Sequence, residues 1–201
     1  LKKMNSRKRQ KYLKLMFECR KRIETLHDLA SGEFGGVYLQ VLIETEALQL
    51  RKLLELIAFS SLISHEAAYR TVTQNIDGVW KAKRIMCELG KINQNFYPLP
   101  VSEITNDGWK KLKGGYLTKK QFIALYDECS THIHVRNPYR VSENSLAFHK
   151  KVPAYLSRIE SLLSRHIVSL VDDMELLFVE VPHFEDSTSP IRIRYLVKDD
   201  G

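Results

Sequence analysis

Apolar residues recur at steps of three and four positions over most of the chain, which is the spacing of amphipathic α-helices. In the first such segment, residues 6–29, one face carries Tyr12, Leu15, Met16, Cys19, Ile23, Leu26 and, just beyond it, Ala30. The same spacing predicts four further helices, over residues 37–64, 65–89, 118–135 and 153–174. The second helix is apolar nearly all round, which is typical of the central helix of a bundle.

Capping and turn-forming residues mark the ends of these segments. Thr118 is a favourable N-cap and Pro153 suits the first turn of a helix, whereas Pro138 ends the preceding helix. Asn75-Ile76-Asp77-Gly78 is a sequence that kinks or splits a helix. Residues 91–117 are punctuated by prolines and glycines, so we predict a long irregular connection of the kind that is usually functional or mobile.

The last part of the chain changes to a period of two. Leu177, Val179 and Val181 alternate with Phe178 and Glu180. After a turn-rich stretch, residues 191–197 alternate in the same way, which predicts an antiparallel pair with Glu180 opposite Arg192 or Arg194. The predicted fold is therefore mainly α: a five-helix bundle over residues 1–175, with a β-hairpin over residues 176–201 packed on the same single domain.

Composition adds limits on class and location. The 201 residues are 44% hydrophobic and 27% charged, as in ordinary globular domains. The three cysteines form no CxxC pair, which argues against a disulfide framework or a zinc ribbon and favours a reducing, cytoplasmic setting. The most apolar stretch carries five charges, so we expect no membrane span; these are Glu44, Glu46, Arg51, Lys52 and Glu55.

Positive charge is concentrated in the first helix. The net charge is +7, but residues 1–22 hold ten basic side chains and only one acid, Glu18, so the remainder of the chain is slightly acidic. Clustered cations favour the phosphates of nucleic acid, whereas the alternative is a solvated helix face. The candidate phosphate-binding residues are Arg7, Lys8, Lys11, Lys14 and Lys21.

A second cationic segment mixes lysines with rings, between Trp109 and Lys120. Exposed rings next to cations suit single-stranded nucleic acid, because bases stack on the rings. The alternative is that Trp109 and Tyr116 pack in the core while the lysines stay in solvent. The candidate residues here are Trp109, Lys110, Lys111 and Lys113.

Two sets of histidine and arginine residues are candidates for catalysis. His132, His134 and Arg136 lie at the end of the fourth helix, where a histidine would move a proton and an arginine would hold a phosphate; simple helix capping is the alternative. Arg22 and His27 also carry the chemistry of metal-free RNA cleavage, although five residues of helix separate their directions by about 140°. Cys129 and His132 lack a second ligand pair, so we predict no metal site, and no fingerprint predicts a cofactor.

The run Tyr126-Asp-Glu-Cys-Ser-Thr-His-Ile-His134, followed by Asn137-Pro138, resembles helical proteins of bacterial toxin and abortive-infection systems, of the HEPN superfamily. That resemblance implies a four- to five-helix bundle that either cleaves RNA or binds nucleic acid without catalysis. Nucleases of the superfamily carry an Arg-x4–6-His motif near a late helix, with a polar residue directly after the arginine. Arg136-Asn137 matches the start of that motif, but Val141 and Ser142 occupy the histidine positions.

Three function hypotheses follow. The first is a helical binding or effector module that contacts RNA or DNA in a bacterial defence or regulatory setting. The second is a metal-independent ribonuclease that uses one of the His/Arg pairs. The third is an adaptor or homodimerisation domain with a protein partner, because the C-terminal hairpin offers a sheet edge and the second helix an apolar face.

Overall fold

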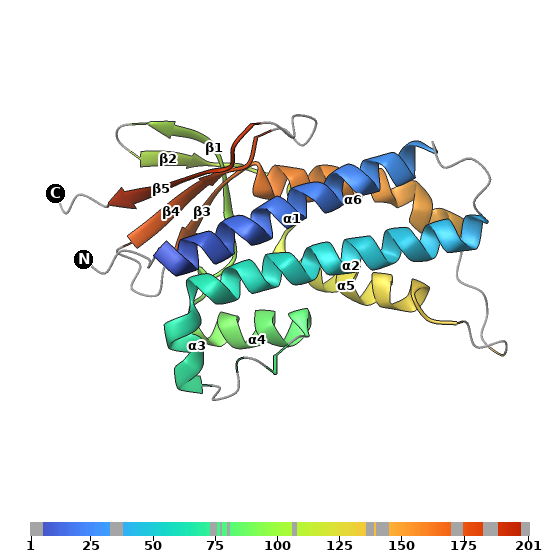
Figure 1. Cartoon of the computed structure of the whole chain (residues 1–201), viewed down its shortest axis with the longest axis horizontal. Helices are drawn as coiled ribbons and strands as arrows, with labels where there is room; N and C mark the ends of the chain where they lie inside the picture. The colour runs from blue at the N-terminus through green and yellow to red at the C-terminus, as the bar shows by residue number, and fades with distance from the viewer. Residues whose placement is uncertain are drawn as a thin grey trace.

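A computed structural model shows helices stacked against a small antiparallel sheet (Figure 1). It describes residues 6–32, 38–72, 76, 78–79, 81–105, 108–135, 139, 145–169, 175–182 and 189–197. The helices within these ranges are α1 (Ser6–Ser31), α2 (Leu39–Ser64), α3 (Glu66–Val72), α4 (Ala82–Ile92), α5 (Lys119–His132) and α6 (Ser145–Leu163). The strands are β1 (Leu99–Thr105), β2 (Gly108–Lys111), β3 (Arg165–Ser169), β4 (Glu175–Glu180) and β5 (Arg192–Val197).

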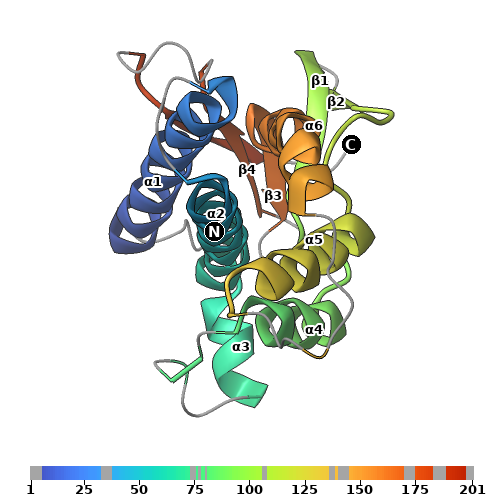
Figure 2. The ribbon, with the colours of Figure 1, turned by 90° about the vertical axis from the view of Figure 1, so that its right-hand side faces the viewer.

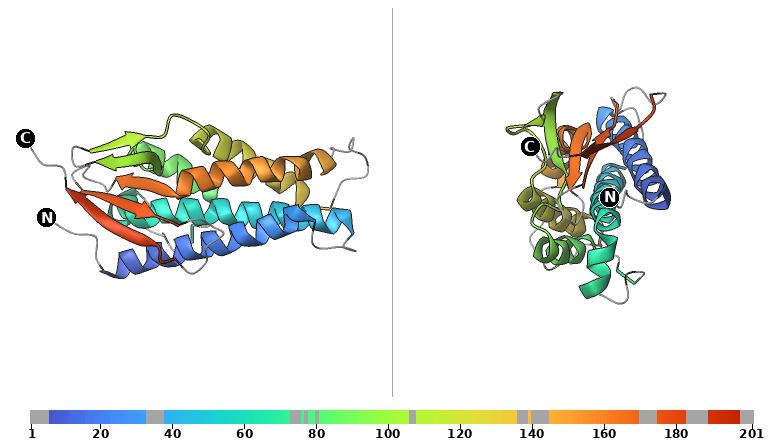
Figure 3. Two further views of the ribbon diagram at one scale, coloured as in Figure 1. Left: turned by 90° about the horizontal axis from the view of Figure 1, so that it is seen from above. Right: turned by 90° about the vertical axis from the view of Figure 1, so that its left-hand side faces the viewer.

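The long helix α2 is the centre of the helical layer, as its apolar sequence predicts. Helices α1, α4, α5 and α6 all pack on it, and α1 runs antiparallel to it along its whole length (Figures 1 and 3). Its inward side chains Leu50, Leu54 and Ile57 are fully buried. Burial of a leucine or isoleucine side chain contributes roughly 1.5–3 kcal/mol, so this helix supplies much of the stability of the core.

The sheet lies beside the end of the bundle where α1 begins and α2 ends (Figure 1). Its strand order is β2-β1-β3-β4-β5, and all neighbours are antiparallel. One face joins the main core through Val168, Leu177 and Val179, while the other carries a second apolar cluster around Ile167 and Phe178. Strand β1 is joined to β3 by only two residue pairs, Leu99 with Ile167 and Pro100 with His166.

The prediction of a C-terminal antiparallel pair is confirmed, but the pair belongs to a larger sheet. Glu180 lies opposite Arg192, and its carboxylate also approaches Arg165, at 3.7 and 3.5 Å respectively. Strand β3 was expected to be helical. Residues 165–169 are buried at every position but the first, so their two apolar side chains, Ile167 and Val168, stand side by side without the alternation that marks a strand with one solvated face.

Other element predictions need correction, and the five-helix count is wrong. The third predicted helix is divided into α3 and α4, as the Asn75–Gly78 sequence allows. Residues 91–117, expected to be irregular, contain the hairpin of β1 and β2, whose short strands alternate too little to stand out. Helix α6 begins at Ser145 with Pro153 inside it, because Phe148 and Val152 bury their side chains and offset the hydrogen bond that proline removes.

The predicted N-cap of α5 is confirmed and forms a capping box. The Thr118 hydroxyl accepts from the Gln121 backbone N–H, and the Gln121 side chain accepts from the Thr118 backbone N–H.

We expect Thr118→Ala to lower the free energy of unfolding by about 1 kcal/mol, measured by urea denaturation. The matched control is Thr25→Ala at an exposed position inside α1, which should change stability by less than about 0.5 kcal/mol. Equal losses in the two variants would contradict a capping role.

Candidate nucleic-acid interface

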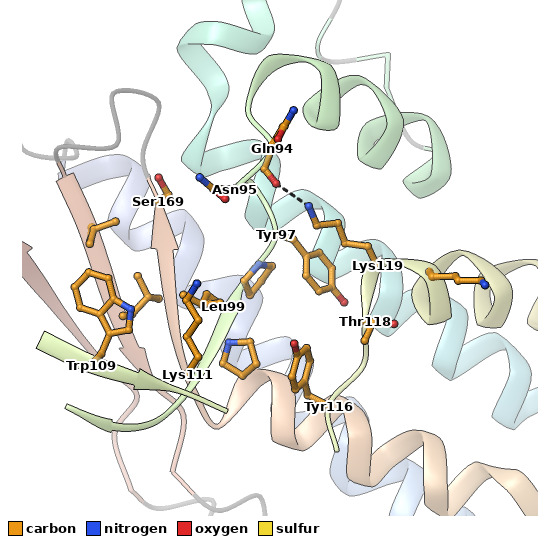
Figure 4. A pocket seen from close by; sticks show the side chains of 15 residues that line it. Gln94, Asn95, Tyr97, Leu99, Trp109, Lys111, Tyr116, Thr118, Lys119 and Ser169 are labelled. Atoms are coloured by element: carbon orange, nitrogen blue, oxygen red, sulfur yellow. Dashed lines mark hydrogen bonds between the residues drawn. The ribbon is translucent and has the colours of Figure 1, made fainter. Parts of the chain in front are cut away.

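A cavity of about 600 Å³ opens between the β1–β2 hairpin, the outer face of the sheet and the start of α5 (Figure 4). We call it the hairpin pocket. It is lined by Gln94, Asn95, Tyr97, Pro98, Leu99, Pro100, Trp109, Lys111, Tyr116, Thr118, Lys119, Lys120, Ile167, Ser169 and Leu176. The pocket thus joins the sequence-predicted segment 109–120 to residues that lie more than forty positions further along the chain.

Apolar rings and side chains form the inner surface of the hairpin pocket. Trp109 is half-buried and packs against the cluster that contains Ile167 and Leu176, so its ring is neither fully in the core nor free in solvent. Tyr97 is fixed by its hydroxyl, which donates to the Leu117 carbonyl at 2.9 Å. Tyr116 is also partly exposed and lies across the pocket from Trp109 in Figure 4. The flat surfaces are therefore held in place before any ligand arrives.

The charged residues that line the hairpin pocket all carry positive charge. They are Lys111, Lys119 and Lys120, and no aspartate or glutamate is among the lining residues. The Lys119 ammonium donates to the Gln94 carbonyl at 2.7 Å and lies 5.0 Å from the Phe96 ring centre. Partial desolvation lowers the pKa of Lys119 from its usual value. Within the described ranges no carboxylate lies within ion-pairing distance of these three lysines, so their charge is available to an anion.

Two further hollows continue from the hairpin pocket along the space between α4 and α5, which lie side by side in Figure 2. Their volumes are about 660 and 530 Å³. The nearer one shares Gln94, Asn95 and Lys119 with the hairpin pocket, and the two hollows share Lys83 and Cys87. We call them together the α4–α5 groove. Its cationic lining residues are Arg51, Lys81, Lys83, Arg84, Lys91 and Lys119.

The far end of the α4–α5 groove is fixed by a polar cluster around Arg51. Its guanidinium donates to the Tyr126 hydroxyl at 2.8 Å and to the Ser130 hydroxyl, and it covers the Tyr126 ring at 4.3 Å. Tyr126 in turn donates to Glu55 at 3.1 Å. Burial, followed by the Glu55 carboxylate, raises the pKa of Tyr126, so the hydroxyl is neutral near pH 7. The cluster ties α2 to α5 at this end of the groove.

Many cations of α1 are already engaged in the fold. Lys8 approaches Glu66 at 3.6 Å, and Arg20, although basic, is buried and donates to the Ser189 carbonyl at 2.7 Å. The predicted residues Arg7, Lys11, Lys14 and Lys21 are exposed. The ammonium of Lys21 lies 4.8 Å from the Phe17 ring centre. The helix therefore presents a solvated basic stripe on an outer surface, and none of these four lysines and arginines lines the hairpin pocket.

Those candidate catalytic residues that lie in the described ranges do not come together. His132 is buried, with its ring 4.3 Å from that of Phe148, whereas His134 is exposed. Arg136 lies outside the described residues. On α1 the other pair separates, because Arg22 donates to Gln49 on α2 at 2.5 Å and His27 binds Glu160 on α6 at 2.6 Å.

The other two predicted lysines of the hairpin lie outside the pocket. Lys110 points away and pairs with Glu103 at 2.7 Å, and Lys113 is exposed. Because side chains alternate along β2, Lys111 is the one of the two β2 lysines that shares the pocket with Trp109.

Sequence reasoning missed the cations of the α4–α5 groove and the sheet side of the hairpin pocket. The sequence does contain a pattern that indicates the groove cations, since Lys81, Lys83 and Arg84 form a dense basic run. Ser169 and Leu176 carried no such signal, because their place depends on strand pairing.

Searches against protein-family models, curated proteins and solved structures found no match. None of the helices in the described ranges is both long and apolar enough to cross a membrane. Among the same residues, no three histidine, cysteine, aspartate or glutamate side chains gather as ligands of a metal ion would.

Proposed function

We propose that this protein binds single-stranded nucleic acid in the hairpin pocket and along the α4–α5 groove. The observation that carries the proposal is the lining of the hairpin pocket. Lys111 lies beside the half-buried ring of Trp109 and Lys119 lies on the opposite side of the pocket (Figure 4), and the lining also includes Lys120 but no carboxylate. Cations track a phosphate backbone, and rings stack with bases of any sequence.

The geometry favours a single strand over a duplex. In a duplex the bases stack on each other and hide their faces, so the rings of Trp109 and Tyr116 would find no partner. A single strand offers base faces to the rings and phosphates to the lysines at the same time. The α4–α5 groove extends the positive lining, although Lys83 is partly neutralised by Asp127 at 2.7 Å and Arg84 by Glu88 at 2.8 Å.

We expect Trp109→Ala to raise the Kd for a fluorescently labelled 12-nucleotide strand about tenfold or more, because stacking on one ring contributes roughly 1–3 kcal/mol. Fluorescence anisotropy at low salt measures this change, and Trp109→Phe should retain most of the affinity. Phe17→Ala is the matched control, since Phe17 is another exposed ring beside cations, 44% exposed on α1.

An unchanged Kd for Trp109→Ala would contradict the proposal. So would binding that does not weaken between low and moderate salt, because phosphate contacts release counterions.

A further inference from the structure

We infer that the hairpin pocket is a site for one nucleoside monophosphate unit, with the base on the apolar inner surface and the phosphate among the lysines at the rim. The inference rests on the proposed function and deepens it, because it names the unit that the pocket recognises. A free nucleotide and the terminal nucleotide of a strand have this chemistry in common.

The volume and the form of the hairpin pocket fit such a unit. About 600 Å³ lies within the range of roughly 300–1,000 Å³ that is usual for sites of small ligands. The inner surface is built from Trp109, Leu99, Ile167 and Leu176, with Pro98 and Pro100 beside them. These groups are flat or aliphatic, so they suit the face of a planar heterocycle.

The polar groups of the hairpin pocket are placed for a base edge and a phosphate. Asn95 is exposed at the rim, and its side-chain amide offers both a donor and an acceptor, as the edge of a base requires. Lys111 lies between Trp109 and Tyr116 in Figure 4, next to the position of a stacked base. A phosphate on the ribose of such a nucleotide would therefore come close to Lys111.

Lys119 is the best-held cation of the hairpin pocket. An ammonium has three N–H donors, and the described contacts commit one of them, to the Gln94 carbonyl at 2.7 Å. The Phe96 ring at 5.0 Å restrains the same group. The remaining two donors are available to phosphate oxygens, and the restraint lowers the entropy lost when a phosphate binds.

The pocket carries no group that would select against an anion. With Lys111, Lys119 and Lys120 at the rim and no acidic lining residue, an uncharged nucleoside would lose the charge-assisted hydrogen bonds that a nucleotide makes. We therefore expect the monophosphate to bind at least tenfold more tightly than the nucleoside, and ribose 5-phosphate to bind more weakly than either because it has no base to stack.

The test is calorimetric titration of the whole chain with AMP, UMP, adenosine and ribose 5-phosphate. Saturable binding of AMP or UMP with one site per chain is expected, and Trp109→Ala and Lys119→Gln should each raise the Kd about tenfold. Lys113→Gln is the matched control, because it removes the same charge from an exposed position outside the pocket and should leave the Kd within twofold.

The outcomes separate this inference from the proposed function. If the labelled strand binds but AMP and UMP give no saturable heat, the nucleotide site is wrong and strand binding stands. If AMP binds but the strand does not, the pocket is a nucleotide site and the proposed function is wrong. If adenosine binds as tightly as AMP, or Lys113→Gln weakens binding as much as Lys119→Gln, the assignment of the phosphate to the rim lysines is overturned.

Discussion

Replacement of Lys111, Lys119 and Lys120 together by glutamine is expected to weaken binding of the labelled single strand about a hundredfold at low salt. All three line the hairpin pocket without a carboxylate partner within the described ranges, so each is available to a phosphate. For single strands each phosphate contact contributes about 0.7 to the slope of log Kd against log salt, so the slope should fall by about 2. Anisotropy titrations at several salt concentrations measure both quantities.

The competing site on α1 provides the matched control. Replacement of Lys11, Lys14 and Lys21 by glutamine removes the same charge from exposed positions of one helix. If the strand lies in the hairpin pocket, this variant should lose less than about threefold in affinity, through the weaker overall field alone. The reverse result, with a large loss on α1 and little in the pocket, would move the interface to the first helix and overturn our assignment.

Acidification from pH 7 to pH 4 is expected to remove about 3 kcal/mol of stability through His166 alone. Its imidazole is fully buried, Nδ1 donates to the Leu163 carbonyl at 2.9 Å, and Nε2 accepts from the Tyr12 hydroxyl at 2.8 Å. Burial lowers the pKa of His166 from 6.5 to about 4, which the bond to Leu163 offsets only in part. The folded state thus holds the neutral form, and stability is complete above pH 6.5 and is lost as the pH falls toward 4.

His166→Gln isolates this contribution, because glutamine can donate and accept but does not titrate. Urea denaturation at pH 7 and pH 5 should show that the unmodified chain loses about 2 kcal/mol more than the variant over this interval. Glu46, whose pKa is raised mainly by burial, titrates in both proteins, so its contribution to the pH dependence of stability cancels in the comparison. Equal losses in the two proteins would show that His166 is already charged in the folded state, or that it is not buried.

The periodicity of the sequence predicts the elements whose side chains face one environment along their length. The central position of α2 and the pairing of Glu180 with Arg192 follow from such patterns. Strand β3 does not follow from such a pattern. His166 and Val168 face the helices while Ile167 faces the second apolar cluster, so both faces of the strand are buried and the alternation of apolar and polar residues disappears. Nothing local to those residues separates a doubly buried strand from a helix.

The candidate site, like the fold, can be predicted from the sequence only in part. The mixture of lysines and rings in residues 109–120 predicts a cationic aromatic surface, and the structure places Trp109, Lys111 and Tyr116 in one cavity. The opposite wall comes from β3 and β4, whose positions depend on pairings between distant segments. The first helix is predicted as an interface only because its basic residues are dense in the sequence. That density does not distinguish the buried, structural Arg20 from the solvated Lys14.

The attachment of the β1–β2 hairpin has a mechanical consequence. Only two residue pairs join β1 to β3, and one of them includes Pro100, which has no N–H to donate. A small rotation of the hairpin about this joint would break few hydrogen bonds between β1 and β3, but it would shift Val101 and Trp109 against Ile167 in the second apolar cluster. Trp109 and Lys111 would move with the hairpin, whereas Lys119 is held by α5. The distance between the Trp109 ring and the Lys119 ammonium therefore depends on how the hairpin packs on this cluster. If the pocket binds a nucleotide as we propose, that packing decides whether the wider purines and the narrower pyrimidines both fit.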